Sequence, residues 1–245
     1  MLEVDIQKKI YKIADGTTLE AIEGIKFKLE SNTFTCIVGP SGCGKTTTLR
    51  AILGLDIDFT GNINFNEQRG GTGRVAAVFQ EPRLLPWRRV EDNVRLAMPH
   101  ELKDQSLSEL FSELGIEHVK QFFPSELSLG LARRVALARA YALEPELLIL
   151  DEPFVSLDDA TADHLRQLLS SLCQSRPTTS LMVTHNLSEA ATLADRIIVL
   201  SARPSSILED VSIDILPGDR TDKDISDVIN YIKSVQALGV NTAAR

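Results

Sequence analysis

Residues 39–46 read Gly39-Pro40-Ser41-Gly42-Cys43-Gly44-Lys45-Thr46, the GxxxxGK(S/T) spacing of a phosphate-binding loop, or P-loop. A short apolar run at 34–38 comes before the loop, and a helical pattern over 46–53 follows it. In a loop placed this way, backbone N–H groups and the positive end of the helix converge on phosphate oxygens. A chance glycine-rich turn is the alternative, and the flanking strand and helix argue against it. The stretch therefore predicts an α/β fold built around a nucleotide-binding loop.

The residues of this loop predict separate roles at a bound nucleotide. Gly42 and Gly44 permit close backbone approach and unusual backbone angles. Lys45 would neutralise β- and γ-phosphate oxygens, and Thr46 would offer its hydroxyl to Mg²⁺. We therefore expect ATP and Mg²⁺ here, bound by Gly39, Pro40, Ser41, Gly42, Cys43, Gly44, Lys45, Thr46 and Thr47.

Cys43 has two interpretations. A helix N-terminus close to bound phosphate is an environment that can lower the pKa of a thiol, in which case alkylation of Cys43 would block nucleotide binding. The alternative is a small residue that simply fills space in the loop.

The rest of the chain extends the α/β pattern. Further short apolar runs at 75–79, 147–150 and 180–183 suit strands buried on both faces, and helical patterns at 133–142 and 159–172 alternate with them. Alternating patterns at 4–11, 25–29 and 61–65 predict a small antiparallel region. We expect two strands around a turn at 202–216 and a final amphipathic helix at 224–238.

A helical insertion interrupts this pattern. Prolines punctuate residues 81–121, and residues 106–114 form a short amphipathic pattern. The predicted fold is a P-loop NTPase core with a mostly parallel sheet, an N-terminal antiparallel β region and an inserted helical subdomain. We expect one domain over 1–245, with the core and β region at 1–80 and 141–245 and the insertion at 81–140.

Composition excludes several other classes. The chain has 245 residues, 43% of them hydrophobic, and a formal net charge of −8, which disfavours a duplex-DNA binder. Three cysteines with no CxxC spacing suggest neither a disulfide framework nor a zinc site. No stretch approaches the length needed to cross a bilayer, and the N-terminus is charged where a signal peptide is apolar. We expect a cytoplasmic protein that reaches membranes through a protein partner.

Two carboxylates follow the apolar run at 147–150. Asp151, at a strand end, can hold Mg²⁺, and Glu152 can orient and deprotonate the attacking water. Alone, such a pair is usually a solvated turn. Paired with a P-loop, it predicts ATP hydrolysis.

The order of the remaining motifs resembles the ATPase subunit of an ABC transporter along nearly the whole chain. The resemblance is carried by Gln80 after Val78-Phe79, by Leu127-Ser128-Leu129-Gly130-Leu131 leading into residues 134–140, by Ser156-Leu157-Asp158 and by Val183-Thr184-His185. The usual LSGGQ pattern is altered, because Leu129 stands at the first glycine, Leu131 at the glutamine and Ala132 where a basic residue is common.

The resemblance implies a role for each of these residues. Gln80 would contact Mg²⁺ and the water, His185 the γ-phosphate, and Asp158 the dimer interface. Ser128 and Gly130 would come from the opposite subunit of a homodimer that sandwiches two ATP molecules. Tyr11 would stack on adenine, with simple packing as the alternative.

Residues 78–90 further resemble the nitrate, sulfonate and taurine importer group. In that group a membrane permease and a solute-binding protein complete the transporter, and the ATPase lies on the cytoplasmic face of the inner or plasma membrane. Trp87 would anchor the permease contact, or else pack into the insertion's own core.

Three other classes remain as alternatives. A chromosome-maintenance ATPase would need long heptad-bearing arms between P-loop and signature, and the charge of this chain is wrong for DNA. The second alternative is a regulatory protein that dimerises on ATP without productive hydrolysis. The reason to consider it is Leu129, which replaces a glycine of the signature. A small-molecule P-loop kinase has no reason to combine the signature with Asp158 and His185.

Overall fold

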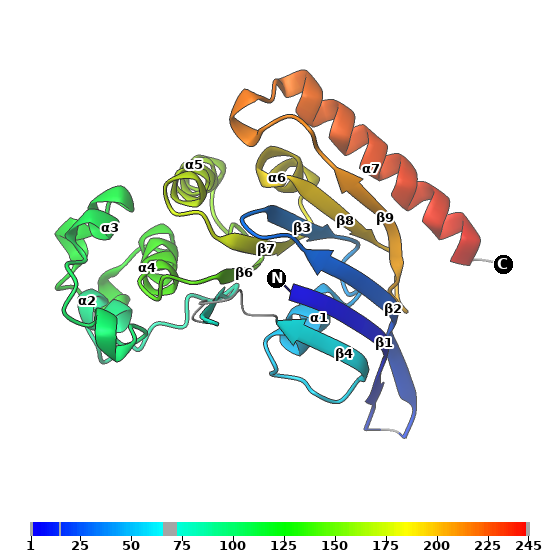
Figure 1. Ribbon diagram of the computed structural model, residues 1–245, viewed down its shortest axis with the longest axis horizontal. Coiled ribbons are helices and arrows are strands. Elements are labelled where there is room, and N and C mark those ends of the chain that lie inside the picture. Colours follow the sequence, from blue (N-terminus) through cyan, green and yellow to red (C-terminus); the bar gives the residue numbers. More distant parts are fainter. Residues whose placement is uncertain (1, 15, 66–72, 244–245) are drawn as a thin grey trace. The chain divides into compact units, whose positions relative to one another are not determined.

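The computed structural model describes residues 2–14, 16–65 and 73–243 (Figure 1). The chain divides into two compact units, residues 1–70 with 179–245 and residues 71–178. The predicted insertion, 81–140, falls inside the second unit. Its boundaries stay a prediction, as does the single domain over 1–245, parts of which (1, 15, 66–72 and 244–245) lie outside the described residues.

The first unit contains an antiparallel sheet near the N-terminus. Its strands are β1 (Leu2–Lys12), β2 (Thr18–Leu29) and β4 (Thr60–Phe65), with β1 in the centre (Figure 1). Leu2, Val4 and Ile6 alternate along β1 as fully buried residues, so one face of the strand packs into the core. The predicted antiparallel region is therefore confirmed.

The same unit contains four further strands in the order β7-β3-β8-β9. These are β3 (Phe34–Val38), β7 (Thr179–Thr184), β8 (Arg196–Leu200) and β9 (Ile207–Ser212). β3 pairs in parallel with β7 and β8, whereas β9 is antiparallel to β8. Every residue of β3 and β7 is buried, which is why their sequences are continuous apolar runs rather than alternating ones.

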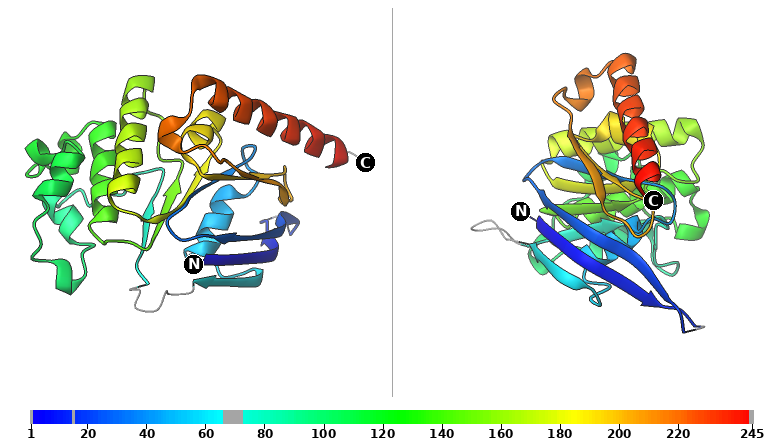
Figure 2. Two further views of the ribbon diagram at one scale, coloured as in Figure 1. Left: turned by 45° about the horizontal axis from the view of Figure 1, so that its top comes forward. Right: turned by 90° about the vertical axis from the view of Figure 1, so that its right-hand side faces the viewer.

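Three helices belong to this unit: α1 (Lys45–Ile52), α6 (Leu187–Leu193) and α7 (Asp222–Ala243). α7 packs against α6, β8 and β9, and Figure 2 follows this helix to the C-terminus in two views. A short 3₁₀ helix, Pro217–Asp219, precedes it. The predicted final helix is thus confirmed and extends beyond 224–238.

The prediction of two strands at 202–216 is wrong. Only β9 lies there, and its partner β8 ends at Leu200, before that range begins. Residues 201–206 form the connecting turn, where Ser201 Oγ accepts a hydrogen bond from the Ser206 N–H (2.9 Å). Pro204 has no N–H to donate to a strand ladder, which explains why pairing stops there.

The second unit carries a parallel strand pair and most of the short helices. The strands are β5 (Val75–Val78) and β6 (Leu147–Asp151). The helices are α2 (Val90–Arg95), α3 (Ser108–Glu113), α4 (Leu129–Tyr141) and α5 (Asp159–Ser175), with 3₁₀ turns at His100–Leu102, Glu117–Val119 and Pro124–Glu126. α4 contacts β5, α2 and α5, and it begins four residues before the predicted 133 because Ser128 caps it.

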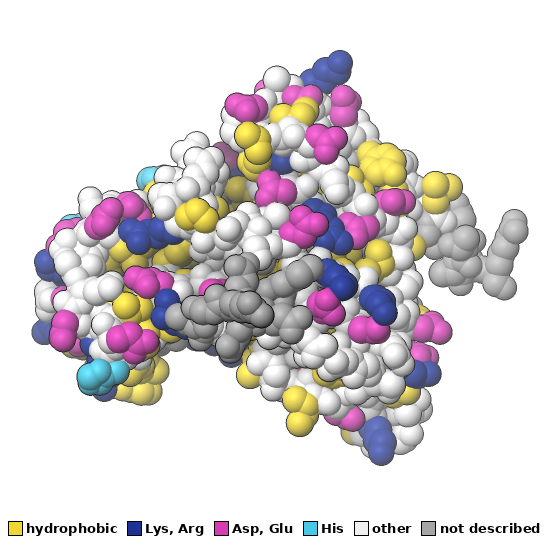
Figure 3. All heavy atoms as spheres, in the orientation of Figure 1, with side chains coloured by type: hydrophobic (Ala, Val, Ile, Leu, Met, Phe, Trp, Pro, Cys, Tyr) yellow, Lys and Arg dark blue, Asp and Glu magenta, His cyan; other side chains and the backbone are white. Residues whose placement is uncertain are grey.

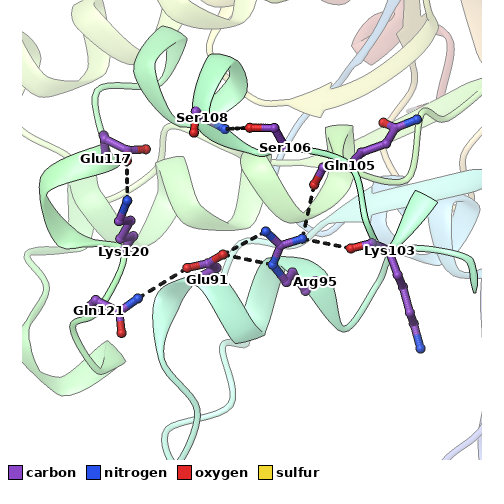
Figure 4. A network of polar contacts seen from close by, with 9 residues as sticks. All are labelled: Glu91, Arg95, Lys103, Gln105, Ser106, Ser108, Glu117, Lys120 and Gln121. Atoms are coloured by element: carbon purple, nitrogen blue, oxygen red, sulfur yellow. Dashed lines mark hydrogen bonds and ion pairs between the residues drawn. The ribbon is translucent and has the colours of Figure 1, made fainter.

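A polar network ties together the segments around α2. In Figure 4, Arg95 points toward Glu91 and toward the carbonyls of Lys103 and Gln105, with donor–acceptor distances of 2.9, 3.0 and 3.2 Å. Gln121 donates to the other Glu91 oxygen. These contacts fix the loops of the insertion against α2.

The surface carries mixed charge. On the face drawn in Figure 3, acidic and basic side chains of the described residues are interspersed. No helix in the described part of the chain is both long enough and apolar enough to span a bilayer.

Candidate nucleotide-binding site

The P-loop and His185 meet at one edge of the parallel strands of the first unit. Val38, at the end of β3, is level with Thr184, at the end of β7. The segments that follow β3 and β7 therefore leave the sheet at the same edge, which is the usual place for a ligand in a parallel sheet. His185 lines a pocket of about 960 Å³ together with Gly39, Pro40 and Ser41.

The loop has the backbone that the sequence predicts. Gly42 and Gly44 have φ values of 76° and 114°, a region that disfavours any side chain. Lys45 is 5% exposed, and its Nζ donates to the carbonyls of Gly39 (2.9 Å) and Pro40 (3.0 Å). Its positive charge is therefore held within the loop. Thr46 is exposed at the first turn of α1, as a hydroxyl offered to a ligand must be.

The low-pKa interpretation of Cys43 is wrong. Its side chain is 1% exposed, and burial raises the pKa of the thiol, an effect that the nearby Lys45 charge only partly offsets. The sulfur packs behind the loop, since a Cβ added to Gly39 would lie 2.9 Å from it. Cys43 therefore fills space as a neutral thiol, and we expect it to resist alkylation in the folded protein.

Tyr11 lies at the end of β1, tied to α1 and to the segment after it. Its hydroxyl donates to Asp56 Oδ2 (2.9 Å) and reaches Thr47 Oγ1 at the long distance of 3.5 Å. Lys9 Nζ lies 4.5 Å from the centre of the Tyr11 ring. Tyr11 is half-buried, so part of its side chain remains accessible.

In the second unit, Gln80, Asp151 and Glu152 gather at one strand edge. Val78 of β5 is level with Leu150 of β6, so the chain carries all three predicted residues out at that edge. Glu152 has a φ of 46°, an uncommon conformation for a residue with a side chain. Strained backbone of this kind is concentrated at functional sites.

The signature residues occupy the start of α4. Ser128 Oγ accepts a hydrogen bond from the Leu131 N–H (3.3 Å), and Leu129 is 42% exposed. A Cβ on Gly130 would lie 2.7 Å from Thr161 Cγ2 of α5. From the sequence, we expect a glycine here so that the backbone can approach phosphate. The structure adds a second reason, because the α4–α5 contact has no room for a side chain at this position.

Asp158 caps α5. Its carboxylate accepts from the Thr161 N–H (3.0 Å) and from Thr161 Oγ1 (2.7 Å), and these hydrogen bonds lower the pKa of Asp158. The side chain is exposed. Gly130 and Asp158 are therefore linked through one threonine, a connection that the sequence did not predict.

The residues predicted to hold Mg²⁺ carry oxygen ligands. Thr46 of the first unit offers a hydroxyl, whereas Gln80 and Asp151 of the second unit offer amide and carboxylate oxygens, the hard ligands that this ion prefers. In the described ranges no three His, Cys, Asp or Glu side chains cluster as a metal site of their own. Mg²⁺ usually binds through one or two protein ligands together with substrate phosphates, which suits so sparse a set.

One side chain that holds the P-loop in place was not predicted from the sequence. Arg203, in the β8–β9 turn, donates from Nε (2.9 Å) and from Nη2 to the carbonyl of Gly42. The two residues are far apart along the chain, and no local pattern marks such a contact.

Comparisons with known proteins agree with these features. Residues 22–155 match the family described as "ABC transporter". The aliphatic sulfonates import ATP-binding protein SsuB 2 of Burkholderia cenocepacia is 38% identical over 230 residues, which cover 92% of this chain and 83% of the relative. SsuB of Bacillus anthracis is 39% identical over 196 residues, covering 78% and 77%.

A solved structure adds agreement at the level of the fold. The dimeric post-hydrolysis state of the ATP-binding cassette MJ0796, bound to ADP and Pi, aligns with a TM-score of 0.72 at 26% identity and covers 88% of this chain and all of that one. The P-loop NTPase fold with an antiparallel N-terminal region is confirmed. Together these findings show that the chain belongs to the ABC transporter family, as one of its ATP-hydrolysing subunits.

Proposed function

We propose that this subunit powers import of aliphatic sulfonates, or of another small solute such as taurine or nitrate. The observation that carries the solute class is the 38% identity with sulfonate-import ATP-binding proteins over nearly the whole chain. The altered signature around Leu129 does not favour a regulatory or DNA-maintenance ATPase, because relatives over that same length are named as import proteins.

Hydrolysis would use the two groups of residues described above. Glu152 is the proposed general base for water, Lys45 and His185 stabilise charge on the γ-phosphate, and Gln80 orients the water. Thr46, Gln80 and Asp151 would hold Mg²⁺, which neutralises charge on the transferred phosphoryl group when bound. The backbone of Glu152, held at an unusual φ, supports a functional role for this residue.

Ser128, Gly130 and Asp158 are proposed to act across a homodimer. A single P-loop covers only part of a γ-phosphate, so donors from a second copy would complete its surroundings. Leu129 is exposed at the first turn of α4, so this substitution leaves Ser128 and the backbone of Gly130 in place at the helix start. We therefore expect the altered signature to support hydrolysis.

Trp87 is proposed to anchor a membrane permease. The ring is 70% exposed, which rules out packing in the insertion's own core. The buried side chain of Asn93 holds the loop that presents it, accepting from the Leu85 N–H (2.7 Å) and donating to the carbonyls of Arg88 (3.0 Å) and Arg89 (3.1 Å). A large aromatic ring on a fixed loop has the character of an interface anchor. The permease would place the subunit on the cytoplasmic face, with a solute-binding protein on the other side.

Solute uptake tests this function. Cells that lack the gene are complemented with wild type, Glu152→Gln or Glu109→Gln, the last being a matched change at an exposed residue of α3. We expect wild type and Glu109→Gln to restore uptake of radiolabelled ethanesulfonate and Glu152→Gln to fail. Restored uptake by Glu152→Gln would contradict the catalytic assignment. If wild type restores uptake of taurine or nitrate alone, that compound is the solute. Restoration of none of the three refutes the solute class.

A further inference from the structure

A buried lysine lies behind the Tyr11 ring. Lys9 and Tyr11 are two residues apart on β1, so their side chains share one face of the strand. Lys9 is only 4% exposed, and its ammonium lies 4.5 Å from the ring centre. This geometry is a cation–π contact that occupies one side of the ring.

Asp56 fixes both side chains from the segment that follows α1. Its Oδ1 accepts from Lys9 Nζ (2.7 Å), and its Oδ2 accepts from the Tyr11 hydroxyl (2.9 Å). Lys9 also donates to the carbonyl of Asp58 (2.6 Å). The charge of Lys9 is therefore satisfied, as a buried ammonium requires.

The same segment is anchored to the helix that begins at the P-loop. The N–H groups of Leu55 and Asp56 donate to the carbonyl of Arg50, at 2.9 and 3.2 Å. Through Asp56, the Tyr11 ring is thus held relative to the end of α1, and α1 starts at Lys45. The position of the ring is coupled to that of the phosphate-binding loop.

We propose that Lys9 and Asp56 are positioning residues for the nucleotide base, acting through Tyr11. This inference rests on the proposed function as an ATP-hydrolysing subunit and on the adenine-stacking role that the family resemblance implies for Tyr11. Asp56 fixes the ring orientation, and the Lys9 charge behind the ring draws electron density from it, which favours stacking of an electron-rich purine on the opposite face. Their contribution acts on the base and leaves the phosphates unaffected.

Binding of ATP compared with inorganic tripolyphosphate separates base from phosphate recognition. The full chain and its Lys9→Met, Asp56→Asn and Tyr11→Ala variants are titrated by calorimetry with each ligand and Mg²⁺. Lys8→Met is the matched control, because Lys8 is an exposed β1 lysine paired with Glu20. We expect Lys9→Met to raise the Kd for ATP about fivefold to tenfold, the size of a partly buried cation–π contribution, with the Kd for tripolyphosphate and the Lys8→Met values unchanged.

A double variant tests whether the effect passes through the ring. In the Tyr11→Ala background, Lys9→Met should no longer change the Kd for ATP. Equal weakening of ATP and tripolyphosphate, no weakening of either, or a full Lys9→Met effect without the tyrosine would each overturn the inference. If Lys9→Met unfolds, as judged by circular dichroism, the comparison is decided by Asp56→Asn, which keeps the shape of the side chain.

Failure of the adenine-stacking role of Tyr11 gives a different result. If Tyr11→Ala binds ATP as tightly as wild type, Tyr11 is not the base platform and the inference falls with it. If wild type binds tripolyphosphate as tightly as ATP, no base recognition exists at this site.

Discussion

Gly130, which we propose approaches phosphate across the homodimer, also lies where the α4–α5 contact leaves no room for a side chain. In an open helix, a change from glycine to alanine stabilises by about 1 kcal/mol. Here the new Cβ would lie 2.7 Å from Thr161 Cγ2, whose rotamer is held by the hydrogen bond to Asp158. We predict that Gly130→Ala lowers the free energy of unfolding by about 1–3 kcal/mol, the usual penalty of overpacking.

A second substitution tests this cause. Thr161→Ser removes the methyl group that the new Cβ would meet and keeps the hydroxyl that bonds Asp158. Urea unfolding should show that Gly130→Ala costs less in the Thr161→Ser background than in wild type. Gly218→Ala, where no atom lies within 4 Å of the added Cβ, serves as control. An equal cost in both backgrounds would rule out the clash with Thr161.

Asp56 predicts a pH dependence of stability. Burial raises the pKa of this carboxyl, but hydrogen bonds from Lys9 and Tyr11 outweigh burial and lower its pKa below the ordinary value. A carboxyl with a lowered folded-state pKa contributes stability above its unfolded pKa of about 3.9 and loses that contribution as the pH falls through the folded value. The stability advantage of wild type over Asp56→Asn should therefore be constant near neutral pH and shrink below about pH 4.

Denaturant unfolding across pH 3–7 measures this difference. Asp58→Asn is the control, since its side chain is 94% exposed and lies 3.7 Å from Lys9. An advantage that grows as the pH falls would contradict the direction of the pKa shift.

Among the elements, the β8–β9 turn is a support for the P-loop. Arg203 bonds the carbonyl of Gly42, within the loop that surrounds the phosphates. We predict that Arg203→Met raises the Kd for ATP and for tripolyphosphate together, by about fivefold, as expected for an exposed charge-assisted hydrogen bond. Calorimetry checks it, with Lys28→Met as a control at an exposed cation of β2, away from the P-loop contact. A change confined to ATP would show that the turn acts on the base instead.

Two variants of the loop before α2 should separate permease binding from the stability of the fold. Asn93→Ala leaves the partly buried Leu85 N–H without its acceptor, so we expect a loss of about 1–3 kcal/mol in unfolding free energy and weaker permease co-purification. Trp87→Ala should weaken co-purification and leave stability unchanged, because the ring is exposed. Undiminished co-purification of Trp87→Ala would contradict the anchor.

The elements also show where prediction from sequence succeeds and fails. Apolar runs identified β3, β5, β6 and β7 because strands buried on both faces need continuous hydrophobic sequence. The sequence prediction did not include β8, although a continuous apolar run marks it at Ile197, Ile198, Val199 and Leu200. Both strands of this pair were expected within 202–216, whereas the first of them ends at Leu200. The contacts of Lys9 with Asp56 join residues far apart in sequence, and no local periodicity records them. The pKa of Cys43 depended on packing that a motif does not specify.

At the scale of the whole molecule, the motif residues are divided between two units. The P-loop and His185 belong to one, whereas Gln80, Asp151, Glu152 and the signature start of α4 belong to the other. The order of these motifs along the chain was sufficient to predict the family, which the comparisons confirm. The particular role of each residue stays a prediction that kinetics must test.

Phosphate release by the purified chain, wild type against Glu152→Gln, shows whether ATP is hydrolysed at the site that contains Glu152. A general base contributes about 10²–10⁴-fold to a hydrolysis rate, so we predict a loss of at least about 100-fold in Glu152→Gln, with ATP still bound. Glu109→Gln should match wild type. Turnover in Glu152→Gln equal to that of wild type would show that Glu152 is not the general base and that hydrolysis takes place at another site.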